Sequence, residues 1–375
     1  MVRIMAPTPS ELVDSCIFCG ICSEVCPFYK ATDDLKNGAM GKVEAAKTLF
    51  SGKELSEAEM KTLLLCTRCD QCLGVCPVNI PVSDIVQGAR AELRKSGNVP
   101  EKYRTIADAI IKAGSPMGVP AEKRRACLPD GYKPPEKAKY LYYTGCWSAL
   151  RLPETAKATI ELLRKANVDF TTLVEKEWCC GLFLIDTGMM EESKKLAEAN
   201  TLLLESTGAE VVICECPSCH DVFKGIYPKL FRQPKYRVMH ISELLKELIE
   251  SGRLNVKKDA ARKAIYKDPC PLVRRHGISE EPRAVVSSCA SLMEFDDNRD
   301  NALCCGAPAG VKPVYPEIAN RLAQMLLDEA KKKGADEITL GCVFCLYHMA
   351  GATKEPEKYP KMLTLSQQVK EALKE

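Results

Sequence analysis

The hydrophobic pattern separates a helical N-terminal region from a longer region in which short apolar runs alternate with amphipathic segments. In the first 115 residues, apolar positions recur with helical spacing and predict helices over residues 40–50, 57–65, 82–95 and 100–113. From residue 138 onward, short apolar runs predict buried strands over residues 139–144, 168–173, 211–214 and 237–240. Amphipathic helices are predicted over residues 153–166, 191–206 and 242–251. This alternation is typical of an open α/β sheet.

The same order of elements returns in the last third of the chain. Strands are predicted over residues 263–267, 291–295 and 337–340, with a long helix over residues 316–333. The C-terminal stretch 362–372 (MLTLSQQVKEA) resembles residues 239–247 (MHISELLKE). A unit of about 120 residues therefore occurs twice, which indicates a duplication and predicts two α/β domains related by pseudo-two-fold symmetry.

Composition identifies cysteine as the unusual feature of the chain. The 375 residues are 46% hydrophobic with a formal net charge of +3, which gives no reason to expect a nucleic-acid partner. No apolar run is long enough to span a bilayer, and the N-terminal stretch MVRIMAPTPSELVDS lacks the apolar core of a signal peptide. We therefore expect the 21 cysteines in a reducing compartment, where thiols bind metal; a disulfide framework is the alternative.

Two cysteine runs in the N-terminal region have the spacing of bacterial ferredoxins, C-x2-C-x2-C-x3-C-P. The first run is Cys16, Cys19, Cys22 and Cys26, and the second is Cys66, Cys69, Cys72 and Cys76. In two-cluster ferredoxins the cysteine before the proline ligates the cluster of the other run. We therefore predict two cubane 4Fe–4S clusters, one held by Cys16, Cys19, Cys22 and Cys76 and the other by Cys66, Cys69, Cys72 and Cys26. Four-cysteine zinc is the alternative.

Each repeat also carries an array of five thiols that includes two adjacent cysteines. The first array, C-x32-C-C-x35-C-x2-C, is Cys146, Cys179, Cys180, Cys216 and Cys219. The second array, C-x33-C-C-x36-C-x2-C, is Cys270, Cys304, Cys305, Cys342 and Cys345. Neighbouring cysteines are poor disulfide partners, so each pair is interpreted as two ligands of one metal centre. Because zinc and a cubane each need only four ligands, either one thiol is spare or an opened iron–sulfur centre has a cysteine that bridges its irons.

This double ferredoxin module followed by two CCG motifs resembles the family of the D-type subunit of heterodisulfide reductase. The family includes the iron–sulfur subunits of glycolate, lactate and anaerobic glycerol-3-phosphate dehydrogenases. The resemblance covers nearly all of residues 10–375. The sequence around the ligands is similar at Tyr143-Thr-Gly-Cys146, Glu177-Trp-Cys-Cys-Gly181 and Asp268-Pro-Cys270. It implies a non-cubane 4Fe–4S cluster on each five-thiol array. It also implies that Cys180 and Cys305 are cluster ligands at a disulfide-reducing site.

The chain departs from the family pattern beside the second array. Pro271 follows Cys270 where many relatives have histidine, and Ala307-Pro308-Ala309-Gly310 replaces a glycine-rich stretch. His220, His276 and His348 lie near cluster ligands in the sequence and are candidate proton sources, although a surface or supporting role is the simpler interpretation. Cys214 and Cys289 are expected to be core thiols, and Cys127 is given no role.

The predicted fold class is α+β and α/β, with a helical bis-cluster ferredoxin domain followed by two duplicated α/β CCG domains. The expected boundaries are residues 1–115 for the ferredoxin domain, 116–137 for a Pro- and Gly-rich linker, and 138–255 and 256–375 for the CCG domains.

The resemblance implies an iron–sulfur electron-transfer and reductase subunit of an anaerobe, with the coenzyme M–coenzyme B disulfide of methanogenesis as substrate. The alternative is a non-catalytic electron conduit for a flavin dehydrogenase that acts on lactate, glycolate, glycerol-3-phosphate or an acyl-CoA. No G-x-G-x-x-G follows a predicted strand, so flavin and nicotinamide are expected on another chain. The expected partners are a flavoprotein dehydrogenase or a membrane cytochrome b. We expect a cytoplasmic protein that contacts a membrane only through a partner subunit.

Overall fold

The computed structural model describes residues 7–374. The chain divides into two compact units, and each is described by itself. Unit 1 contains the residues up to Arg104 together with the segments Phe183–Met190 and Leu303–Leu322. Unit 2 contains Thr105–Leu182, Glu191–Ala302 and Ala323–Glu375. Unit 1 therefore includes the stretch that follows the first vicinal cysteine pair and the stretch that contains the second pair.

The regular elements among the described residues of unit 1 are all helices. Its longest helices are α4 (Ala39–Phe50), α5 (Glu57–Leu64) and α7 (Val82–Lys95). Shorter helices are α1 (Pro9–Asp14), α2 (Ile21–Glu24), α3 (Pro27–Thr32), α6 (Gln71–Gly74) and α18 (Val311–Val314). A capping box at Ser56 starts α5, because the Ser56 hydroxyl and the Glu59 carboxylate satisfy each other's free N–H groups. Buried side chains of α4 and α7, among them Val43 and Ile85, form the core of this unit.

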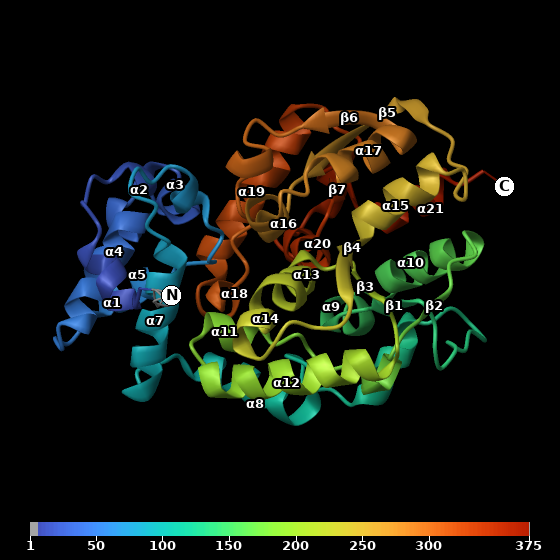
Figure 1. Ribbon diagram of the computed structural model, residues 1–375. Helices are drawn as coiled ribbons and strands as arrows, with labels where there is room; N and C mark the ends of the chain where they lie inside the picture. The colour runs from blue at the N-terminus through green and yellow to red at the C-terminus, as the bar shows by residue number, and fades with distance from the viewer. Residues whose placement is uncertain (1–6, 375) are drawn as a thin grey trace. The chain divides into compact units, whose positions relative to one another are not determined.

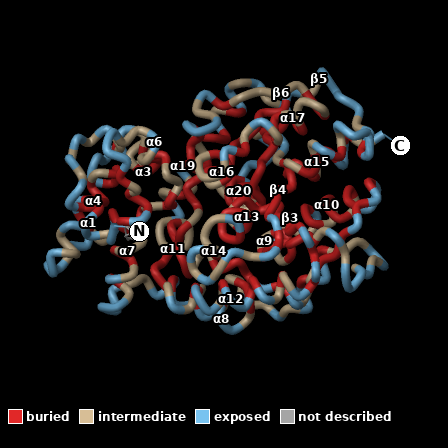
Figure 2. Tube along the Cα trace, viewed as in Figure 1, coloured by how far each residue is buried: buried red, intermediate tan, exposed pale blue. Residues whose placement is uncertain are grey.

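Unit 2 contains two four-stranded parallel sheets with the same strand order (Figure 1). The first sheet has the order β2-β1-β3-β4, and the second has the order β6-β5-β7-β8. The strands of the first are β1 (Tyr140–Tyr143), β2 (Phe170–Thr171), β3 (Val211–Cys214) and β4 (Arg237–His240). Those of the second are β5 (Asp259–Lys267), β6 (Ala290–Glu294), β7 (Glu337–Leu340) and β8 (Lys361–Thr364). Every residue of β3 and β7 is buried, as expected of central strands in parallel sheets; Figure 2 shows β3 as buried.

Helices of unit 2 follow its strands along the chain. They are α9 (Cys146–Leu150), α10 (Pro153–Lys165), α13 (Pro217–Asp221), α14 (Tyr227–Leu230), α15 (Ile241–Glu250), α16 (Cys270–His276), α17 (Glu280–Cys289), α20 (Val343–Ala350) and α21 (Leu365–Ala372). Four further helices contain residues of both units: α8 (Glu101–Ala113), α11 (Leu182–Asp186), α12 (Met190–Ser206) and α19 (Pro316–Lys332).

The two repeats pack on each other through equivalent helices. Helix α10 of the first repeat packs on α21 of the second, and α15 of the first packs on α17 of the second. Ile160, Leu244, Val285 and Val369 are among the buried residues of this shared core. Since α21 is the counterpart of α15, and α17 of α10, the contacts are reciprocal, as they are across a two-fold axis. This agrees with the predicted duplication and confirms the predicted fold class.

The sequence pattern gives most of these elements to within two residues, with exceptions at β2 and β5. Strand β2 is shorter than the predicted 168–173, and β5 begins four residues before the predicted 263–267. The stretch predicted as a linker contains the turn Ala121–Cys127, in which Arg124 and Cys127 are buried. Among the described residues, no helix has both the length and the apolar character needed to cross a bilayer.

Candidate metal centres

Four thiols from both ferredoxin runs line one cavity of unit 1. Cys16, Cys19 and Cys22 come from the first run, and Cys76 comes from the second. The cavity has an open volume of about 370 Å3, and its other walls include Met40. Cys19 is exposed, so the cavity lies at the surface of the unit. Burial, followed by the charges of Cys16, Cys19 and Cys76, raises the pKa of Cys22 to about 11.

The second cavity of unit 1 has the complementary set of thiols. Cys66, Cys69 and Cys72 line a volume of about 340 Å3 together with Cys26 of the first run. Burial raises the pKa of Cys72 well above its ordinary value, and the neighbouring Cys69, Cys66 and Cys26 raise it further. The two sets of sulfurs are those predicted for the two cubane clusters, with the cysteine before each proline crossing to the other run.

The backbone explains why the two runs form similar sites. Phe18 and Arg68 occupy the same position of their runs and have φ of 52° and 53°. Two residues later, Gly20 and Asp70 have φ of 82° and 62°. These left-handed conformations turn the chain so that successive cysteines face one space. Amide groups contribute as well, because the Ile80 N–H donates to Cys76 Sγ at 3.2 Å and the Arg68 N–H to Cys66 Sγ at 3.4 Å.

The two cavities differ in their charge. None of the described residues that line the first cavity is charged, whereas Lys42, Arg68 and Asp70 line the second. Lys42 is 1% exposed, and its Nζ lies 3.6 Å from Cys26 Sγ and 3.0 Å from the Gly38 carbonyl oxygen. Burial raises the pKa of the Cys66 thiol, while the cations of Lys42 and Arg90 act in the opposite direction.

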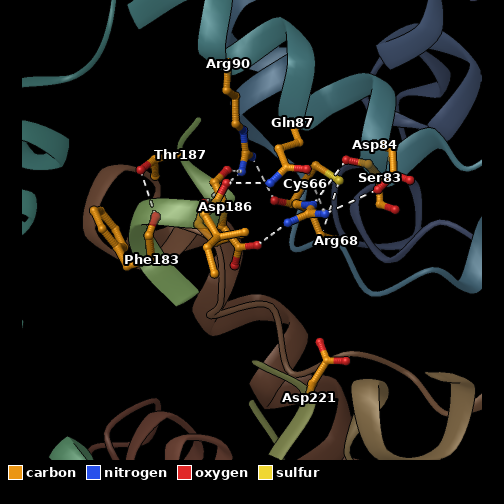
Figure 3. Close-up of polar contacts among 12 residues, drawn as sticks. Cys66, Arg68, Ser83, Asp84, Gln87, Arg90, Phe183, Asp186, Thr187 and Asp221 are labelled. Atoms are coloured by element: carbon orange, nitrogen blue, oxygen red, sulfur yellow. Dashed lines mark hydrogen bonds and ion pairs between the residues drawn. The ribbon is translucent and has the colours of Figure 1, made fainter. Parts of the chain in front are cut away.

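Two buried arginines connect the second run to the stretches that lie beside the vicinal cysteine pairs (Figure 3). Arg90 donates to the carbonyl oxygens of Cys66 at 2.8 Å and of Asp186 and Ala309 at 3.0 Å each. Arg68 donates to the Asp186 carboxylate at 2.6 Å. All of these groups belong to unit 1, so both stretches are anchored on the ferredoxin helices.

In unit 2, the structure brings together the five thiols of the first array. Cys146 Sγ lies 3.9 Å from Cys179 Sγ. Cys180 and Cys219 are hydrogen-bonding neighbours, and so are Cys219 and Cys216. Cys146 begins α9 directly after β1, and Cys216 caps α13 after β3. Both therefore lie at the carboxyl ends of adjacent parallel strands, where an open α/β sheet places ligands.

A buried carboxylate fixes this first array. Glu177 accepts hydrogen bonds from the Thr144 N–H at 2.9 Å and the Gly145 N–H at 2.8 Å, and it pairs with Arg124 at 3.0 Å. Burial raises the pKa of Glu177, although Arg124, Thr144 and Gly145 favour the ionised form. The carboxylate thus holds the loop before Cys146 against the segment that carries the vicinal pair.

The second array is divided between the units. Cys304 and Cys305 lie in unit 1, whereas Cys270, Cys342 and Cys345 lie in unit 2. Within unit 2, Cys342 is a hydrogen-bonding neighbour of both Cys345 and Cys216 of the first array. That all five thiols hold one cluster stays a prediction.

His220, His240, His348 and the remaining cysteines are buried, and His276 is partly buried. His220 is fully buried, and neither of its ring nitrogens has a hydrogen-bond partner among the described residues; its ring stacks edge-on against His276 at 4.6 Å. Burial, then His240 and His276, lowers the pKa of His220 to about 2. His276 pairs with Asp221 at 2.9 Å, and His348 is also buried. Cys127, Cys214 and Cys289 are all 0% exposed, as core thiols are.

The two ferredoxin cavities have the number of thiols that 4Fe–4S clusters need. A 4Fe–4S cluster is larger than one ion, and its four cysteine sulfurs surround it at separate corners. Each ferredoxin cavity offers four thiols around an open space, which fits such a cluster.

Comparison with known proteins identifies two domain families in the chain. A 4Fe–4S dicluster domain family matches residues 12–80, and a cysteine-rich domain family matches residues 140–224 and 264–350. The D-type subunit of a dihydromethanophenazine:CoB–CoM heterodisulfide reductase from Methanosarcina acetivorans is 31% identical over 89% of this chain and 87% of its own length. The chain belongs to this family of heterodisulfide reductase D-type subunits.

Other relatives in the family carry different activities. The B-type subunit of a fumarate reductase (CoM/CoB) from Methanothermobacter marburgensis is 28% identical over 89% of this chain and 67% of its own length. The EtfAB:quinone oxidoreductase of Syntrophomonas wolfei is 27% identical over 92% of this chain and 56% of its own length. This protein is therefore an iron–sulfur subunit of the oxidoreductase type.

The sequence analysis does not identify several residues that support these sites. Lys42, Arg90 and Arg124 are charged residues in polar-looking stretches, where cysteine spacing gives no signal. A lysine between apolar residues of α4 is the one indication that could have found Lys42.

The crossing of ligands predicts the result of a single substitution. Cys26→Ser should disturb the cluster of Cys66, Cys69 and Cys72, because Cys26 Sγ lies in that cavity. Electron paramagnetic resonance (EPR) of the reduced protein should lose or alter one cubane signal, and Cys72→Ser should change the same signal. A Cys26→Ser protein in which the altered signal is instead the one that Cys22→Ser removes would contradict this wiring.

The buried lysine predicts a difference between the two cubane clusters. Lys42→Met should lower the reduction potential of the cluster in the second cavity, because reduction adds negative charge beside this cation. A unit charge about 6 Å away at an effective dielectric constant of about 20 corresponds to a shift on the order of 100 mV. A redox titration followed by EPR measures the shift. Lys53→Met, which removes an exposed lysine, is the control and should leave both potentials unchanged. Equal potentials in Lys42→Met and the unsubstituted protein would contradict the assignment.

Proposed function

We propose that this chain is a reductase subunit that takes electrons singly at its ferredoxin sites and reduces a disulfide substrate at its CCG domains. Two cubane clusters would be held by Cys16, Cys19, Cys22 and Cys76 and by Cys66, Cys69, Cys72 and Cys26, and two non-cubane clusters by the five-thiol arrays. When bound, these clusters supply one-electron redox chemistry. The observation that carries the proposal is that a unit 2 thiol of the second array lies beside the first array, where Cys216 neighbours Cys342.

The proposed reaction is RS–SR′ + 2 e− + 2 H+ → RSH + R′SH. The sulfur–sulfur bond breaks, a partner redox subunit supplies both electrons, and each product sulfur takes one proton. Two equivalent thiol arrays suit a substrate with two sulfurs, one for each array. We propose the coenzyme M–coenzyme B disulfide as substrate, which the name of the Methanosarcina acetivorans relative contains. Cys180 and Cys305, the second members of the vicinal pairs, would be the ligands at this site.

A second candidate is supported by Pro271. This residue follows Cys270 in the first turn of α16, and it offers neither an N–H nor an acidic side chain. A chain without a proton donor beside this cysteine is better suited to passing electrons onward than to protonating product thiolates. The alternative function is therefore an electron conduit that is fed by a flavoprotein partner. The relative named as an EtfAB:quinone oxidoreductase supports this alternative.

The two candidates predict opposite results in one experiment. Protein prepared without oxygen should contain about 16 irons, four for each of four clusters. After reduction with a viologen dye, addition of the heterodisulfide should re-oxidise it at a catalytic rate, with both thiols as products. Cys305→Ser should abolish this rate, because the substitution removes a ligand of the proposed site.

Cys289→Ser is the matched control, because Cys289 is a buried cysteine outside all four ligand sets. It should keep both the iron content and the rate. A protein with all clusters intact that is not re-oxidised by the disulfide would leave the conduit as its function. Near-stoichiometric zinc with only about eight irons would contradict cluster binding by the five-thiol arrays.

A further inference from the structure

We infer that Thr67 is a positioning residue for the second vicinal pair: its hydroxyl hydrogen-bonds the Cys304 sulfur and raises the reduction potential of the cluster that Cys304 helps to hold. The inference rests on the proposed function only in requiring that Cys304 is a cluster ligand.

The hydrogen bond joins two buried groups of unit 1. Thr67 Oγ1 lies 3.3 Å from Cys304 Sγ, and the two residues are 6% and 1% exposed. A hydroxyl can donate as well as accept, so it donates to the sulfur once Cys304 is a thiolate ligand without its proton. Bonds to charged acceptors are the stronger ones. Because reduction places more negative charge on the ligand sulfurs, this donor stabilises the reduced state.

Both sides of the hydrogen bond are held by one guanidinium. Arg90 donates to the Cys66 carbonyl, one residue before Thr67, and to the Ala309 carbonyl, five residues after Cys304. Tyr103 also donates to the Ala309 carbonyl at 3.3 Å. The adjacent Gly310 has φ of 81°, and a Cβ there would lie 2.4 Å from the Tyr103 ring, so the chain comes close to the ring only because this residue is glycine.

The side chain at position 67 is suited to this role. Threonine is branched at Cβ, so its hydroxyl has few rotamers and keeps its direction. On the other side of Thr67, Arg68 is fixed by the Asp186 carboxylate and by the Ser83 carbonyl at 3.1 Å. The equivalent position of the first run is Ile17, which is 59% exposed and has no hydroxyl. The two runs therefore differ at this position: the second run has a hydroxyl that contacts a vicinal cysteine, and the first run has an exposed apolar side chain.

The test compares Thr67→Val with Thr67→Ser in the intact protein with its clusters bound. Valine keeps the shape of threonine but cannot donate, so the potential of one CCG cluster should fall. Thr67→Ser should restore it towards the original value. Redox titration followed by EPR gives the potentials, and Cys304→Ser identifies the signal that belongs to this cluster. Thr62→Val is the control, because Thr62 is equally buried but its hydroxyl lies 3.4 Å from Asn37 Oδ1; it should leave that potential unchanged.

A second readout keeps the inference falsifiable where Thr67→Val fails to retain iron. Electron–nuclear double resonance of the unsubstituted protein should show an exchangeable hydrogen coupled to this cluster, replaced by deuterium in D2O. An unchanged potential in Thr67→Val, or a cluster without that exchangeable coupling, would overturn the inference. Failure to reduce disulfide would overturn the proposed function instead, since neither readout depends on turnover.

Discussion

The guanidinium of Arg90 is the group on which the architecture of unit 1 depends. It is 1% exposed and donates to the carbonyl oxygens of Leu63, Leu64, Cys66, Asp186 and Ala309. An uncompensated buried cation costs several kcal/mol, and a hydrogen bond from a charged donor contributes about 1.5–3 kcal/mol. The five acceptors together offset burial of the charge. They belong to three stretches far apart in the sequence, so one side chain holds those stretches together. Lysine has only three donors from a single nitrogen and could not span them.

Buried carboxylates perform the corresponding role in unit 2, but the two repeats place them differently. In the first repeat, Glu177 precedes a vicinal pair and accepts N–H groups from the loop before Cys146. In the second, Asp268 precedes Cys270 and accepts the N–H of Arg299 at 2.8 Å, in the stretch before the vicinal pair. Arg124 and Arg283 neutralise the two carboxylates. The two repeats therefore carry the buried carboxylate on different segments. In the first repeat it lies just before the vicinal pair, and in the second it lies just before the first cysteine of the array.

The sequence is informative where one residue type decides the structure. The apolar run of β3 gives its observed ends, because a central strand of a parallel sheet is buried on both faces. The ends of β4 and β7 also match, although β4 begins at the exposed Arg237 and β7 contains Glu337 and Thr339. Cysteine spacing likewise gives the thiols that line each ferredoxin cavity.

Arg90 and Thr67 cannot be found in this way. Cys304 lies 237 residues from Thr67, and Arg90 binds carbonyl oxygens as far as 219 residues away. An arginine in an amphipathic helix also has the pattern of a solvated one. The burial of Arg124 is missed for the same reason, since its stretch is rich in charge and proline while its partner Glu177 lies 53 residues further on.

Charge and burial together favour electron transfer from the first ferredoxin site to the second. The first cavity opens at the exposed Cys19, and its described lining carries no charge. The second has Lys42 against Cys26 and the Arg90 cation near Cys66, and its lining also carries Arg68 and one carboxylate, Asp70. A buried cation favours the reduced form of a neighbouring cluster, because in a low dielectric its attraction for added negative charge is weakly screened. Under the proposed function, an electron received at the exposed site is therefore more stable at the second site. Thr67 belongs to the same cysteine run as this second site. It directly follows Cys66, and its hydroxyl oxygen lies 3.3 Å from the sulfur of the vicinal cysteine Cys304. This direction of electron transfer follows from the side chains of Lys42, Arg90 and Thr67. It does not depend on which partner supplies the electron.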